Sequence, residues 1–192
     1  LGDGGGARRA LGDDGVGAFG VACYYLPFVF MVGNAVAQSA QPIVSCNFGI
    51  GAWTRVRAAL RVSMEAAFLC GAISAIAFVA LPKPLVGLFL SLESPAASIA
   101  TGGFPWMGVG FVFFVANLAV IGLCQSVERV RPATIFALAR GCVFLIPCFL
   151  ILPAALGTKG IWLALPCSEI LTSAAILVWL LCMRGKRPAA GQ

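Results

Sequence analysis

Five apolar runs, each long enough to cross a lipid bilayer, constrain this chain more than any other feature of its sequence. A helix needs about 20 residues to cross roughly 30 Å of hydrocarbon. The chain is 60% hydrophobic and 10% charged, and its mean hydropathy of +0.99 lies outside the range of soluble domains. The sequence therefore predicts an all-α, polytopic transmembrane helical bundle. Its expected spans are residues 16–41, 62–81, 103–125, 132–156 and 161–183.

The basic residues between the spans indicate the orientation of the bundle. The joints after the first, third and fifth spans are rich in arginine and lysine, whereas the other two joints carry only Lys83 and Lys159. By the positive-inside rule, residues 184–192 form a basic cytoplasmic tail and residues 1–15 lie outside the cytoplasm. This topology accounts for the net charge of +6. We therefore expect the lipid bilayer to be a partner of the chain, and we expect no nucleic acid. The basic joints contain Arg55, Arg57, Arg61, Arg129, Arg131, Arg184, Lys186 and Arg187.

The segment before the first span is polar and glycine-rich, "LGDGGGARRALGDDG". It has no apolar core of the kind that a signal peptide carries. A polar segment outside the cytoplasm requires an earlier span to deliver it, and the first residue is Leu1 rather than Met. We therefore expect residues 1–15 to be the remnant of a loop, with further spans encoded upstream.

No pattern in the sequence indicates an enzyme or a resident metal. The chain has no histidine, and it lacks a nucleophile elbow, a phosphate-binding loop and, within its apolar spans, a close pair of carboxylates. Its 8 cysteines form no CxxC pair, so we interpret them as small packing residues. Neither catalytic residues nor a metal or organic cofactor are expected. The cysteines are Cys23, Cys46, Cys70, Cys124, Cys142, Cys148, Cys167 and Cys182.

Polar side chains recur at steps of three or four along the first span, which places them on one face of a helix. Two interpretations are open. Amides at membrane depth bond neighbouring helices, or a longer polar stripe borders a water-filled cavity. The stripe consists of Tyr24, Pro27, Met31, Asn34, Gln38 and Gln41.

The third span carries a weaker version of this stripe. Asn117 is its central amide, and Phe114 and Trp106 are aromatic side chains of the kind that line ligand sites. The alternative is that these rings face lipid or pack against other helices.

Three ionisable residues lie within the spans, where each charge costs about 2.5 to 3.5 kcal/mol at the bilayer centre. Glu65 and Arg140 are close enough to the cytoplasmic side for us to expect that they extend toward it. Glu169 lies deeper, so it is the best candidate for a group that couples transport to a proton or ion. Ser168, Thr172 and Ser173 surround it in sequence, and a structural carboxyl bonded to these hydroxyls is the alternative.

Two long stretches resemble the C-terminal lobe of the MATE family of multidrug and toxic-compound efflux transporters, in its bacterial branch. They are "AQSAQPIVSCNFGIGAWTRVRAALR" and "QSVERVRPATIFALARGCVFLIPCFLILPAALGTKGIWLALPCSEILT". The resemblance extends over residues 12–183 and implies spans 8 to 12 of a twelve-span transporter with two six-helix lobes. The missing N-terminal lobe of the same polypeptide is then the main partner.

The resemblance further implies export of amphipathic or cationic drugs across the inner (plasma) membrane by alternating access, driven by antiport of H⁺ or Na⁺. The tenth span of some members carries an acid, which residues 103–125 lack. Coupling carboxylates are therefore expected mainly in the absent half, with Glu169 as the candidate in this chain. The expected substrate-cavity residues are Tyr24, Met31, Asn34, Gln38, Phe114 and Asn117.

The segment from Gln38 to Arg61 is expected to end the first helix in a glycine turn and then to run along the cytoplasmic interface. We interpret it as a hinge region between a moving helix and the membrane surface. Two other functions stay open from the sequence. One is a flippase for lipid-linked oligosaccharides from the same superfamily, and the other is a five-span membrane subunit that transports nothing.

Overall fold

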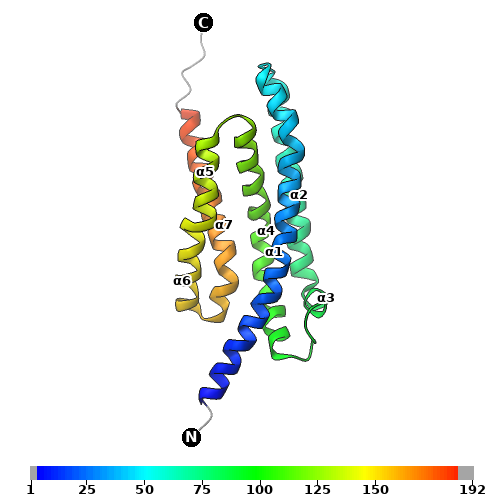
Figure 1. Ribbon diagram of the computed structural model, residues 1–192, viewed down its shortest axis with the longest axis vertical. Coiled ribbons are helices and arrows are strands. Elements are labelled where there is room, and N and C mark those ends of the chain that lie inside the picture. Colours follow the sequence, from blue (N-terminus) through cyan, green and yellow to red (C-terminus); the bar gives the residue numbers. More distant parts are fainter. Residues whose placement is uncertain (1–3, 186–192) are drawn as a thin grey trace.

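The computed structural model describes residues 4–185 and is built from helices (Figure 1). No strand occurs among these residues, which confirms the predicted all-α class. Residues 1–3 of the predicted loop and 186–192 of the predicted tail lie outside the described part. In chain order the elements are α1 (Gly4–Gly49), α2 (Trp53–Ala80), α3 (Pro82–Gly87), α4 (Pro95–Ser126), α5 (Val130–Leu138), the π-helix η1 (Ala139–Phe144), α6 (Leu145–Leu156) and α7 (Thr158–Gly185).

Among the described residues, 5 helical segments are long and apolar enough to cross a membrane, which confirms the predicted multi-pass bundle. The α5–η1–α6 segment acts as one of them. Figure 1 shows that successive spans alternate in direction. The α1–α2 connection, the α4–α5 connection and the end of α7 therefore lie at one end of the bundle, and these are the joints rich in arginine.

Helix α1 is longer than the span predicted at residues 16–41. It has 46 residues from Gly4 to Gly49, so residues 4–15 are helical rather than a loop. Polar composition reports exposure to water and does not by itself prevent a helix, and Ala7 to Leu11 are good helix formers. At the other end the helix continues through Pro42.

Helix α4 occupies the centre of the bundle. In its apolar window 78% of the residues are buried, against 11 to 44% in the other spans. Glycines allow its neighbours to approach closely, as in other membrane helices. A methyl group added at Gly110 would lie 2.9 Å from the Pro166 Cα atom on α7, and one added at Gly71 on α2 would lie 2.9 Å from the Val112 Cα atom.

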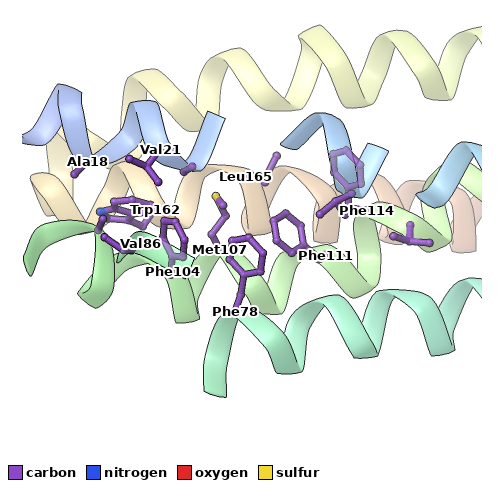
Figure 2. Close-up of a cluster of buried hydrophobic side chains, with 14 of the residues drawn as sticks. Ala18, Val21, Phe78, Val86, Phe104, Met107, Phe111, Phe114, Trp162 and Leu165 are labelled. Carbon is purple, nitrogen blue, oxygen red and sulfur yellow. The ribbon is translucent and has the colours of Figure 1, made fainter. Parts of the chain in front are cut away.

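Aromatic side chains fill the space around α4 (Figure 2). Phe78 of α2 lies 4.8 Å from Phe111, measured between ring centroids, and 5.0 Å from Phe104. Trp162 of α7 is buried on the other side of Phe104. These contacts hold α2, α4 and α7 in one cluster, which continues through Phe111 to Phe114 at 6.3 Å.

The turn between α1 and α2 agrees with the predicted glycine turn. Gly51 has a φ of +70°, a left-handed conformation that glycine adopts without a steric penalty. The Ala52 amide donates a hydrogen bond to the Asn47 carbonyl at 2.9 Å and closes the turn. The proposed hinge role of this segment stays a prediction.

The cysteines divide into different environments. Cys124 and Cys148 are buried, as expected for packing residues, whereas Cys23, Cys46, Cys142 and Cys182 are exposed. An exposed side chain on an apolar span faces lipid or an open cavity, so packing does not explain all of these positions.

Candidate functional site

The most unusual feature inside the bundle is an ion pair between Arg140 and Glu169. The Arg140 Nε atom lies 2.7 Å from the Glu169 Oε1 atom, and the two side chains are 14% and 2% exposed. A charge that far from water is retained when a partner neutralises it. The expectation that Arg140 extends toward the cytoplasmic side is therefore wrong, because its guanidinium points inward to the carboxylate.

Asn117 of α4 holds the other side of the Glu169 carboxylate. Its Nδ2 atom donates to Glu169 Oε2 at 2.8 Å and to the Glu169 carbonyl at 3.0 Å. Ser173 Oγ donates to the Asn117 Oδ1 atom at 2.9 Å, which fixes the orientation of the amide. Each carboxylate oxygen thus has a donor, from α4 on one side and from η1 on the other.

The hydroxyl groups next to Glu169 in sequence do not bind its carboxylate. Ser168 donates to the Leu165 carbonyl at 2.8 Å and Thr172 to the Ser168 carbonyl at 2.9 Å. Serine and threonine in helices commonly bond back to their own backbone in this way. The alternative in which these hydroxyls bond the carboxyl is therefore wrong, and the partners of the carboxylate come from other helices.

Phe114 of α4 packs its ring face against the guanidinium of Arg140. The Arg140 Cζ atom lies 4.0 Å from the centre of the Phe114 ring, within the range of a cation–π contact. Phe30 of α1 meets the same ring edge-on, with 6.5 Å between the centroids. Arg140 is thus held by an aromatic face as well as by a carboxylate.

Arg140 lies on η1, the six-residue π-helix that separates α5 from α6. Sequence reasoning missed this element, although single π-turns occur often at functional sites. The signal for it is Pro147, which cannot donate the hydrogen bond that an α-helix would send to the Val143 carbonyl. From this element Arg140 bonds Glu169, 29 residues further along the chain.

A cavity of about 440 Å³ opens beside the ion pair. Its walls come from α1, α4, α7 and the η1–α6 segment, so four of the spans contribute. All its lining residues are apolar or aromatic except for a thiol and the charged pair. They are Cys23, Leu26, Pro27, Phe30, Phe114, Arg140, Gly141, Leu145, Leu165 and Glu169.

The predicted site residues fall into two groups. Phe114 and Glu169 line this cavity, and Asn117 lies behind it as the partner of Glu169. The second group lies outside the cavity: Tyr24 and Met31 are 63% and 67% exposed, and Gln38 is also exposed. Their role as the lining of a cavity in a larger transporter stays a prediction.

Asn34 is intermediate between the two groups. It is half-buried, and its amide donates to the Phe30 carbonyl at 3.0 Å. Asn34 lies one turn beyond Phe30, so it continues the helical face that Cys23, Pro27 and Phe30 present to the cavity. Sequence reasoning missed the apolar residues on this face, because nothing distinguishes them from residues that contact lipid.

These features define a polytopic α-helical membrane protein with a ligand-sized cavity and an interior ion pair. The MatE family profile matches residues 8–150 of the chain. The match covers more than half of the sequence, and the chain belongs to the MatE family. The matched region ends in α6, so α7 and Glu169 lie beyond the match.

A relative of known sequence supports the same assignment. The chain is 25% identical over 160 residues to a protein of Pseudomonas aeruginosa described as "Probable multidrug resistance protein NorM". The aligned region covers 79% of this chain and 32% of the relative. The chain thus spans about a third of the length of the relative. No solved structure matches it.

Proposed function

We propose that the chain forms most of the C-terminal lobe of a drug-efflux transporter that exchanges its substrate for H⁺ or Na⁺. The observation that carries the proposal is a paired interior carboxylate, Glu169, beside a cavity in a chain of the MatE family. The name of the relative supports a role in multidrug resistance. Proteins that move ligands in this way perform no covalent chemistry, so the proposal includes no enzymatic activity.

The cavity has the properties of a drug site. Its volume of about 440 Å³ lies within the range of small-molecule pockets, which are mostly apolar with a few polar groups in fixed positions. Phe30 and Phe114 offer aromatic surfaces. An amphipathic molecule with a flat apolar body is the class of ligand that such walls favour.

The ion pair supplies a means of coupling. Protonation of Glu169 would remove its negative charge and weaken its bond to Arg140, and a sodium ion at the carboxylate would compete with the guanidinium. Either event changes the wall of the cavity. A ligand and an ion that favour different arrangements of this wall are thermodynamically linked, as antiport requires.

The polar face of α1 supports a second lobe as partner. Tyr24, Met31 and Gln38 are exposed on the same side of the helix, although the Tyr24 ring stacks on Phe89 with 5.4 Å between the centroids. The relative is about three times as long as the aligned region. We propose that this face borders the cleft between two lobes, with the arginine-rich end of the bundle and the C-terminus in the cytoplasm and the protein in the inner membrane.

The test is efflux from bacteria that lack their own drug pumps and express the transporter that contains this chain. Accumulation of ethidium, a cation, and of rhodamine 110, a zwitterion, is measured with and without the proton and sodium gradients. We expect at least one dye to accumulate several-fold less, and the difference to vanish when the coupling gradient is removed. Glu169→Gln should abolish it, whereas the exposed control Glu65→Gln should not. Unchanged accumulation of both dyes would refute the proposal.

A further inference from the structure

We propose that Arg140 sets the ligand specificity of the cavity by donating hydrogen bonds to an oxygen of the ligand. The site then favours a zwitterionic or anionic amphipathic molecule over one that carries only positive charge. This inference rests on the proposed function, because it names the ligand class of the same cavity.

The first argument is the set of donors that Arg140 keeps free. A guanidinium has five N–H donors, and Arg140 uses the one on Nε for Glu169. Its two Nη atoms, which carry the other four, donate to no group within residues 4–185. The side chain lines the cavity. Unpaired donors in an apolar surrounding are costly, so a ligand oxygen placed there gains more than it would in water.

The second argument is that Glu169 has little to offer a ligand cation. Oε1 already accepts from Arg140 and Oε2 from Asn117, and the Glu169 side chain is only 2% exposed, so an incoming ammonium group has little access to the carboxylate. A carboxylate or carbonyl oxygen of the ligand has to displace nothing. The hydrogen-bonding groups that a ligand can reach in this site are therefore donors rather than acceptors.

The third argument is the position of the aromatic walls relative to those donors. The Arg140 Cζ atom lies 4.0 Å over the centre of the Phe114 ring, so this ring covers one side of the guanidinium. Phe30 stands edge-on to the same ring. A ligand that places a ring against these side chains brings an attached carboxylate next to the Nη atoms.

The test uses two dyes with one aromatic body. Rhodamine 110 carries a free carboxylate, and rhodamine 123 is its methyl ester and a cation. Binding of each to the purified transporter that contains this chain, in lipid nanodiscs, is measured by fluorescence polarisation. We expect the wild type to bind rhodamine 110 about tenfold more tightly, since hydrogen bonds to charged groups are among the stronger ones.

The decisive variant is Arg140→Lys, which keeps the positive charge for Glu169 but replaces the fork of donors with a single nitrogen. We expect the preference to fall to about threefold or less, while Arg131→Lys, an exposed control on α5, keeps it.

An equal or stronger affinity of the wild type for rhodamine 123 would overturn the inference without any variant. An unchanged preference in Arg140→Lys would also overturn it. Failure of both dyes to bind would also overturn it, in favour of an acceptor supplied by another protein segment. Efflux without a carboxylate preference would overturn this inference and leave the proposed function standing.

Discussion

Arg140, Glu169 and Asn117 show how a membrane interior accommodates two full charges. The carboxylate receives a donor on each oxygen, and the guanidinium rests on an aromatic face. The Coulomb attraction between two buried charges is strong, but it must first compensate for their loss of water. Removing one charge is therefore expected to destabilise the folded protein more than removing both charges.

This expectation gives a prediction at the residue scale. Arg140→Leu and Glu169→Leu should each destabilise the protein by on the order of 3 kcal/mol, because each leaves a buried charge without its partner. The double variant should be less destabilised than the sum of the two. The measurement is a double-mutant cycle on the unfolding free energy in detergent micelles, and additive losses would contradict the pair as described.

The sequence predicts part of this cluster and misses part of it. The depth of Glu169 in its span and the position of Asn117 on α4 follow from counting residues along a helix. Arg140 was expected to point outward because a residue near the start of a span usually does so, and neither its π-turn nor its partner 29 residues away is visible in local sequence. The alternative that neighbouring hydroxyls bond Glu169 fails because proximity along the chain is not contact in space.

At the scale of the elements, the spans were predictable and their ends were not. Apolar runs reveal the five crossings, since hydrocarbon tolerates few other segments. The extension of α1 to Gly4 and through Pro42 escapes this reasoning, because a helix can continue into water or past a proline. The π-helix η1 is also not predictable in this way, since sequence periodicity shows which face of a helix is apolar but not which backbone groups bond one another.

The central position of α4 leads to a prediction about its glycines. Gly110→Ala should lower the midpoint of thermal unfolding in detergent, because the added methyl group would lie 2.9 Å from the Pro166 Cα atom, and overpacking typically costs about 1 to 3 kcal/mol. Gly102→Ala on the same helix is the matched control. No atom lies within 4 Å of a methyl group at that position, and alanine favours helices by up to about 1 kcal/mol relative to glycine. Equal effects of the two changes would show that α4 and α7 do not pack as described.

On the scale of the whole molecule, the cavity is the feature that joins the elements. It takes residues from α1, α4, α7 and the η1–α6 segment, so it exists only when these spans are assembled. The apolar residues around it were not predictable, because Leu26 and Leu165 have the same side chains as residues that face lipid. The charged pair in its wall is what separates this space from an ordinary packing gap.

The central claim is that this cavity binds the ligand, and Cys23 in its wall tests it most directly. The measurement is the rate of labelling by N-ethylmaleimide in a variant whose only cysteine is Cys23, with and without rhodamine 110 at ten times its dissociation constant. We predict that the dye slows labelling about tenfold by occupying the cavity. A variant whose only cysteine is Cys46, exposed on the same helix and about 35 Å away along it, should label at an unchanged rate. Labelling of Cys23 that is unaffected by the dye, or that does not occur at all, would contradict the account.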